Sequence, residues 1–316
     1  MKIVVTDSTF QALGPEQAVA DRHGASLAAF QCRTAEDVAT AVEGAYAVFV
    51  QFAPVTEAAL ARLAPGAPIV RYGVGFDNID LPAARKLGHP VAYVPDYCVD
   101  EVADHTLAML LSLYRKLPAL DSSVRSGAWA AVAASRPLKP ASDTVIGFLG
   151  LGRVGRAVLA RLQPFGFQVL VADPMLDAEA ATALGVSRTG FDEMLPCVDA
   201  LLLHAPLTET TRRIVNDDAL SRIKPGAVIV NCSRGALIDE SAIARSLLDG
   251  RLAGAALDVF EIEPLPEKSP LRTAPNLLLT PHAAWYSDSA MDRLQSLAAG
   301  EIDRALSGRP LRCPVQ

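Results

Sequence analysis

Residues 144–155 read Thr-Val-Ile-Gly-Phe-Leu-Gly-Leu-Gly-Arg-Val-Gly and are the strongest indicator of the fold. Its first half is a short apolar run typical of a buried β-strand. Its second half carries Gly150, Gly152 and Gly155. Gly150 permits a tight turn, Gly152 lets the backbone approach a pyrophosphate, and Gly155 lets a helix pack closely on the strand. The stretch therefore predicts a dinucleotide-binding strand–turn–helix unit.

The segments next to the glycine turn indicate which dinucleotide it binds. Arg153 and Val154 begin the expected helix, whose N-terminus offers N–H groups and a positive dipole to phosphates. The next strand ends at Asp173, about 20 residues beyond the first glycine, where an acid accepts hydrogen bonds from ribose hydroxyls. Its charge repels a ribose 2′-phosphate, which favours NAD over NADP. Arg153 and Arg188 keep NADP open, and a purely structural turn is the other alternative.

Short apolar runs alternate with helical stretches on both sides of this unit. Continuous apolar strands between helices indicate parallel sheets covered on both faces, so we predict an α/β protein with two sheets. Residues 101–117 predict a buried helix that ends at Pro118, and residues 118–143 a mixed arm in which Trp129 packs or contacts another subunit. The predicted strands are 2–6, 45–50, 69–72, 91–94, 144–149, 168–172, 200–204, 227–231, 254–259 and 277–280.

Composition excludes several functional classes. The 316 residues are 51% hydrophobic and 20% charged, which is typical of a globular chain of two domains. A net charge of −6 argues against nucleic-acid binding by bulk charge. The five cysteines are widely spaced without a CxxC pair, so we expect neither a disulfide framework nor a metal site. No uncharged apolar run is long enough to span a membrane, and we expect a soluble cytoplasmic protein.

Three later strand ends carry polar groups that suit a 2-keto acid. Arg234 offers a guanidinium fork that binds a carboxylate and polarises the adjacent carbonyl. His282 supplies or removes the proton on the carbonyl oxygen. A carboxylate beside the ring orients it and favours its protonated form. Glu263 and Glu261 both stand near Pro264 and compete for this last role, with spacing in favour of Glu263.

Five motifs together resemble the D-isomer-specific 2-hydroxyacid dehydrogenase family over nearly the whole chain. The resemblance implies that Arg234 binds substrate, Glu263 is the partner of the histidine, and His282 is the acid/base. The motifs are Gly150-Leu-Gly-Arg-Val-Gly155, His204-Ala-Pro-Leu-Thr208, Asn231-Cys-Ser-Arg-Gly235, Asp258-Val-Phe-Glu-Ile-Glu-Pro264 and Pro281-His-Ala-Ala-Trp285.

The resemblance also implies cofactor contacts outside the glycine turn. Cys232 stands where the family often has Thr, and we expect its backbone to make the contact. Asp258 matches a contact to the nicotinamide amide, and Thr106 a phosphate contact. The implied set comprises Val74, Thr106, His204, Ala205, Pro206, Thr211, Cys232, Ser233, Arg234, Asp258 and His282.

Residues 71–80 and 281–287 are similar to the C-terminal-binding-protein branch of the family. That likeness implies that Arg71 and the amides of Gly73, Val74 and Gly75 meet the substrate carboxylate, and that Trp285 lines the pocket. Because the branch includes corepressors, an NAD-sensing interaction protein is one alternative. The intact Arg, Glu and His favour an enzyme, and we expect no docking tail. Glu263 argues against formate as substrate, whereas a phosphite oxidoreductase on this scaffold stays open.

The resulting prediction is two doubly wound parallel-sheet domains with a cleft between them. A Rossmann NAD-binding domain spans residues 99–288, and a flavodoxin-like substrate domain comprises residues 1–98 and 289–316. The resemblance implies a homodimer that reduces a small 2-keto acid to a D-2-hydroxy acid, with hydride from NADH. The substrate stays open among glyoxylate, hydroxypyruvate, pyruvate and 4-methylthio-2-oxobutyrate.

Overall fold

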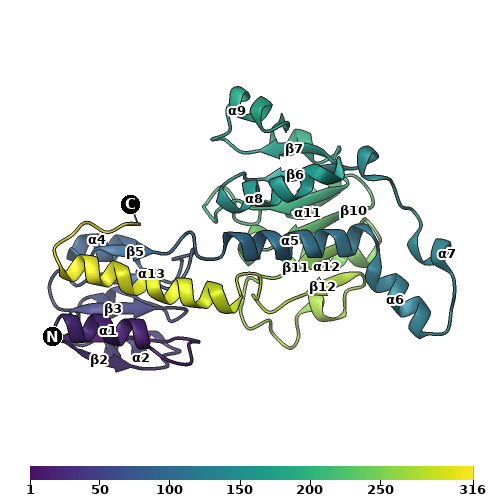
Figure 1. The fold of residues 1–316 in the computed structure, drawn as a ribbon. Helices are drawn as coiled ribbons and strands as arrows, with labels where there is room; N and C mark the ends of the chain where they lie inside the picture. The colour runs from purple at the N-terminus through teal and green to yellow at the C-terminus, as the bar shows by residue number, and fades with distance from the viewer. Residues whose placement is uncertain (316) are drawn as a thin grey trace. The chain divides into compact units, whose positions relative to one another are not determined.

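Two parallel β-sheets organise the chain, one in each of two compact units (Figure 1). The computed structural model describes residues 1–315. Unit 1 comprises Met1–Cys98 and Tyr286–Gln316, and unit 2 comprises Val99–Trp285. None of the helices described in residues 1–315 combines the length and the apolar content needed to cross a membrane.

Unit 1 is a five-stranded sheet in the order β2-β1-β3-β4-β5, which is the flavodoxin-like order. Its central strands are buried because they are runs of Val, Ile and Phe that helices cover. The strands are β1 (Lys2–Val5), β2 (Ser26–Ala29), β3 (Ala47–Val50), β4 (Ile69–Arg71) and β5 (Val91–Tyr93). The helices are α1 (Gly14–Arg22), α2 (Ala35–Ala41), α3 (Glu57–Leu60), α4 (Leu81–Leu87) and α13 (Asp288–Leu306).

Unit 2 is a seven-stranded parallel sheet in the order β12-β11-β10-β9-β6-β7-β8. Counted from β6, this is the Rossmann order with a seventh strand added. The strands are β6 (Val145–Leu149), β7 (Gln168–Ala172), β8 (Ser187–Arg188), β9 (Ala200–Leu203), β10 (Ala227–Asn231), β11 (Leu252–Leu257) and β12 (Leu277–Leu279). The helices are α5 (Val99–Tyr114), α6 (Leu117–Arg125), α7 (Ala131–Ser135), α8 (Arg153–Leu162), α9 (Ala178–Ala183), α10 (Phe191–Met194), α11 (Asp217–Arg222) and α12 (Glu240–Leu248).

The strand register of unit 2 gathers the expected site segments. Leu149 at the end of β6 lies opposite Leu203 at the end of β9, and Asn231 at the end of β10 lies between Leu203 and Leu257. All of these strands are parallel, so the loops that follow them leave the same edge of the sheet. From β6 the strand order runs through β7 and β8 to one edge of the sheet and then from β9 to the other edge. The neighbouring strands β6 and β9 therefore form the topological switch point, where open α/β sheets bind ligands.

The predicted α/β class with two parallel sheets is confirmed. Two strands are not predicted from the sequence, β2 and β8, and both lie at a sheet edge. Strand β8 is only Ser187–Arg188 and has no apolar residue, and β2 reads Ser-Leu-Ala-Ala, which has no β-branched or aromatic residue to mark a strand.

The prediction that one helix runs over 101–117 and ends at Pro118 is wrong. Helix α5 ends at Tyr114, and Lys116 takes a left-handed conformation with φ of 54°. Pro118 lies instead in the first turn of α6, where a missing N–H costs nothing. In Figure 1, α6 and α7 project away from the sheet of unit 2. Trp129 between them is 93% exposed, so it does not pack within the chain.

Candidate active site

The turn after β6 has the shape that its glycines predict. Gly150 has a φ of +88°, and a Cβ there would lie 2.8 Å from the backbone nitrogen of Ala205, which follows β9. Only glycine fits that position. Gly152 is the N-cap of α8 and is exposed, and a Cβ there would meet no atom within 4 Å. The open space lies where a pyrophosphate has to approach.

Three observations show that this edge of the sheet fits a dinucleotide. Among residues 1–315 no side chain caps the N-terminus of α8, so its first N–H groups are available to phosphate oxygens. The Asp173 carboxylate accepts from Leu151 N at 2.6 Å and Met175 N at 2.8 Å, which fixes it beside the turn. A carboxylate has about four acceptor sites, so it retains capacity for ribose hydroxyls.

The third observation that fits a dinucleotide is an unsatisfied buried nitrogen on His204, directly after β9. Its Nε2 is buried and has no hydrogen-bond partner among the described residues. Burial lowers the pKa of His204 to about 4, so the ring is neutral at physiological pH. The loop that follows is closed on itself, because Thr211 donates from Oγ1 to the carbonyl oxygen of Pro206 at 2.7 Å. Ala205 accepts from Ser233 Oγ at 2.8 Å, which joins this loop to the end of β10.

Asn231 shapes the turn that presents Arg234. This asparagine is fully buried at the end of β10; its Oδ1 accepts from Ser233 N at 3.0 Å and its Nδ2 donates to Arg234 O at 2.8 Å. The guanidinium of Arg234 donates to Ser233 O at 2.7 Å, and its positive charge acts on Glu263. The side chain is half-buried, so it is both held and accessible.

His282 and Glu263 form a close pair. His282 Nδ1 lies 2.7 Å from Glu263 Oε2, and both side chains are 34% exposed. Burial by itself raises the pKa of Glu263, but the hydrogen bond to His282, the charges of His282 and Arg234, and the N–H of Phe260 hold that pKa below its ordinary value. Glu263 therefore stays a carboxylate that orients the ring, and Nε2 is the nitrogen left to face a substrate.

The competing acid, Glu261, has a different partner. Its carboxylate accepts two hydrogen bonds from Arg213 Nη2, at 2.8 and 3.0 Å, and one from Nε at 3.0 Å. Arg213 lies at the end of the loop after β9 in a left-handed conformation, with φ of 49°. This ion pair connects that loop to the segment after β11. Glu261 is therefore the partner of Arg213, and Glu263 is the partner of His282.

Three further expected cofactor residues lie deeper. Asp258 is fully buried, and its carboxylate accepts from Thr280 Oγ1 and from two backbone N–H groups. Thr106 is 1% exposed and donates to Val102 O within α5. Burial raises the pKa of Cys232 to about 12, so its thiol is unreactive. The cofactor contacts expected of these residues stay predictions.

Unit 1 carries the expected substrate residues Arg71, Gly73, Val74 and Gly75. Arg71 ends β4; its guanidinium donates to Tyr72 O at 2.7 Å and lies 5.8 Å from the centre of the Phe52 ring. Val74 is 38% exposed on the turn that follows. Trp285 belongs to unit 2 and is half-buried.

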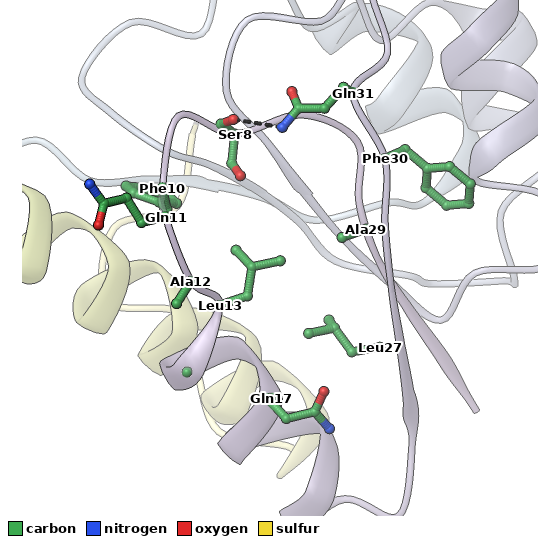
Figure 2. Close-up of a pocket in the computed structure, with 11 residues that line it drawn as sticks. Ser8, Phe10, Gln11, Ala12, Leu13, Gln17, Leu27, Ala29, Phe30 and Gln31 are labelled. Atoms are coloured by element: carbon green, nitrogen blue, oxygen red, sulfur yellow. Dashed lines mark hydrogen bonds between the residues drawn. The ribbon is translucent and has the colours of Figure 1, made fainter.

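A separate cavity of ≈ 560 Å³ lies in unit 1, where the loop after β1 meets the start of α1 and β2 (Figure 2). Phe10, Leu13, Leu27 and Phe30 give it apolar walls, and Gln31 donates to Ser8 O at 2.8 Å across one side. None of its lining residues is titratable, and none is among the expected site residues.

Sequence reasoning missed three residues that hold the backbone segments of the site in place. Asn231, Thr280 and Gly235 have no expected role, yet each fixes a segment of the site. A Cβ on Gly235 would lie 1.9 Å from the carbonyl carbon of Phe260, so the segments that carry Arg234 and Glu263 touch backbone to backbone there. A glycine directly after the arginine was the available signal.

The chain is similar to known proteins over most of its length. Residues 107–284 match the family described as D-isomer specific 2-hydroxyacid dehydrogenase, NAD binding domain. A D-3-phosphoglycerate dehydrogenase from Mycobacterium bovis is 36% identical over 269 residues, which are 85% of this chain and 50% of the relative. The chain thus spans about half the length of the curated relatives it matches.

Solved structures match over essentially the full chain. A protein from Thermus thermophilus has a TM-score of 0.87 at 30% identity, and the match covers 100% of both chains. A D-lactate dehydrogenase from Aquifex aeolicus, complexed with NAD and lactic acid, has a TM-score of 0.86 at 26% identity. That match covers 97% of this chain and 96% of the other.

Proposed function

The chain belongs to the D-isomer specific 2-hydroxyacid dehydrogenase family, and from that premise we propose that it catalyses the reversible reduction of a small 2-keto acid to a D-2-hydroxy acid. NAD is the cofactor of the family domain that residues 107–284 match. The observation that carries the proposal is the His282–Glu263 pair at 2.7 Å, with the charge of Arg234 acting on the same carboxylate.

Each catalytic side chain has a defined task. Arg234 binds the substrate carboxylate and polarises the neighbouring carbonyl through its guanidinium. His282 donates a proton from Nε2 to the carbonyl oxygen during reduction and removes it during oxidation. Glu263 holds Nδ1 and stabilises the protonated ring. Bound NAD(H) supplies or accepts the hydride at the substrate carbon.

The cofactor is held by the edge of the unit 2 sheet. The first N–H groups of α8, at Arg153 and Val154, bind the pyrophosphate, and Asp173 binds the adenosine ribose. The loop from His204 to Thr211 and the backbone of Cys232 and Ser233 line the nicotinamide side. We include cofactor contacts by Val74, Thr106 and Asp258 because the matching residues of the family make them.

Substrate binding and assembly are also proposals. Arg71, Gly73, Val74 and Gly75 are assigned to the substrate carboxylate, and Trp285 to the substrate side chain. Unit 2 is taken as the NAD-binding domain and unit 1 as the substrate domain. The exposed arm of α6 and α7, with Trp129, supports a homodimer; sedimentation that shows a monomer at all concentrations would contradict it. A cytoplasmic location and the C-terminal-binding-protein branch stay predictions.

Two substitutions at His282 test the function. His282 has a φ of 52°, a conformation that Asn tolerates better than Ala. His282→Asn therefore removes the acid/base with the loop preserved, while His282→Ala also strains the loop. We expect both to lower kcat with a 2-keto acid by about 10²–10⁴-fold, and His282→Asn to bind NADH as the wild type does. Wild-type turnover in His282→Asn would exclude the proposed acid/base.

A further inference from the structure

The loop that carries His282 is held by a buried anchor at Asp258. The carboxylate accepts from Ala283 N at 2.8 Å through Oδ1 and from Ala284 N at 3.0 Å through Oδ2. The backbone N–H of His282 donates to Asp258 O at 2.7 Å. A left-handed conformation strains any residue other than glycine, so the conformation of His282, with φ of 52°, depends on these bonds.

Thr280 completes the anchor from the end of β12. Its hydroxyl donates to Asp258 Oδ1 at 2.5 Å, and its carbonyl oxygen accepts from His282 N at 3.0 Å. A hydroxyl has one proton to give. Because an ionised carboxylate only accepts, that proton is committed to Asp258, and Thr280 Oγ1 serves any other partner only as an acceptor.

That other partner is His105, which reaches the anchor from α5. His105 Nε2 lies 3.1 Å from Thr280 Oγ1 and 3.8 Å from Asp258 Oδ1. Since Thr280 only accepts here, Nε2 of His105 has to carry a proton. The chain of donors then runs in one direction, from His105 to Thr280 to Asp258, and the buried carboxylate is 1% exposed at its side chain. Such a chain of hydrogen bonds strengthens each member in a low-dielectric interior.

We propose that His105 is a positioning residue for His282, which acts by donating from Nε2 to Thr280 and so fixing the Asp258 anchor of the His282 loop. The proposal rests on the proposed role of His282 as acid/base. According to the proposal, helix α5, which packs against β10 and β11, helps to position His282 through His105. Loss of the donor removes one of the two hydrogen bonds of the Thr280 hydroxyl, which weakens its hold on Asp258 and loosens the loop. A displacement of about 1 Å at a reacting group can lower a rate by about 10²-fold.

Substitutions that keep or remove the donor separate positioning from general stability. His105→Gln retains an N–H that reaches the position of Nε2, and His105→Leu removes it at similar volume. Likewise, Thr280→Ser retains the hydroxyl and Thr280→Val removes it. We expect His105→Leu and Thr280→Val to lower kcat about 10–100-fold with the KM for NADH little changed, and the Gln and Ser variants to stay within about threefold of wild type. Asp104→Asn on the surface of α5 is the matched control.

Two results would overturn the proposal. One is a kcat for His105→Leu equal to that of Asp104→Asn, in a preparation whose wild type reduces a 2-keto acid. The other is equal loss of kcat in His105→Gln and His105→Leu, since a merely structural role does not distinguish a donor from an apolar group.

A spectroscopic measurement keeps this test independent of turnover. Nuclear magnetic resonance of isotope-labelled histidine, with His105→Gln used to assign the signal, reports which ring nitrogen carries the proton. We expect a protonated Nε2 on His105 and a shift of the His282 signals in His105→Leu. A neutral ring protonated only at Nδ1 would overturn the proposal. If the wild type reduces no 2-keto acid yet shows the expected His105 signal, the proposed function fails and the hydrogen-bond assignment stands.

Discussion

Replacing Gly235 by alanine tests how closely the two segments of the active site have to approach. The added Cβ would lie 1.9 Å from the Phe260 carbonyl carbon, 2.1 Å from its oxygen and 2.4 Å from Glu261 N. Ordinary contact begins at 3.4 Å, so the backbones must separate by about 1.5 Å. All three atoms are backbone, and no side chain can rotate away to make room. The separation therefore moves Glu263, which Phe260 N holds at 2.9 Å, relative to Arg234.

The size of the effect follows from that separation. Overpacking of this kind costs about 1–3 kcal/mol, and we expect the upper end because backbone has to yield. At about 2–4 °C per kcal/mol for a domain of this size, Tm should fall by about 6–12 °C. A shift of about 1 Å at the reacting groups should lower kcat/KM about 10²-fold, which is about 2.7 kcal/mol of transition-state stabilisation.

The assay compares NADH oxidation and thermal melting in Gly235→Ala with a matched glycine. Gly300 lies within α13, and a Cβ there would meet no atom within 4 Å. Gly300→Ala should keep wild-type activity and gain up to about 1 kcal/mol, since alanine favours helix. Equal activity and equal Tm in the two variants would refute the reasoning that the contact of Gly235 fixes the site.

Two further predictions concern charge. Asp173→Asn removes a charged acceptor for ribose hydroxyls, so the Kd for NADH should rise about 10–100-fold and the preference of the protein for NADH over NADPH should become smaller. Fluorescence titration with both cofactors measures the two Kd values. An unchanged ratio of these values would contradict the role of Asp173. Glu263 has a lowered pKa in the folded state, so its contribution to stability is present above its ordinary value of 4.5 and is lost as the pH falls through the lowered pKa. Glu263→Gln should therefore lose stability at neutral pH and show a shallower acid transition, measured by urea unfolding across that range; parallel curves for variant and wild type would count against it.

The sequence predicts the sheets and the reacting groups for the same reason, because both depend on local patterns. Strands such as β9 are continuous apolar runs, and Arg234 and His282 follow strand ends that parallel topology brings to one edge. The edge strands carry a weaker signal, because β2 is Ser-Leu-Ala-Ala without β-branched residues and β8 has only two polar residues. Pro118 does not mark the end of α5, because a proline fits the first turn of a new helix as well as the position after an old one.

The sequence does not predict which donors and acceptors of the site pair with each other. The cofactor contact that the family resemblance implies for Asp258 stays a prediction, and the structure adds that its oxygens accept from Thr280, Ala283 and Ala284. His105 belongs to helix α5, and only the fold brings it to Thr280, which is 175 residues away in sequence. The spacing of residues along the chain does not show which donors bond to a carboxylate. It also does not show which backbone segment packs against a glycine.

Reduction of a 2-keto acid by the purified protein is the decisive measurement. Wild type and His282→Asn would be assayed for NADH oxidation with a panel of 2-keto acids that includes glyoxylate, hydroxypyruvate, pyruvate and 4-methylthio-2-oxobutyrate, and chiral products would be resolved by chromatography. We predict turnover of at least one acid by the wild type, D configuration wherever the product is chiral, and loss of that turnover in His282→Asn with NADH binding intact. A protein that binds NADH and reduces no 2-keto acid, or that yields the L-isomer, would contradict the account.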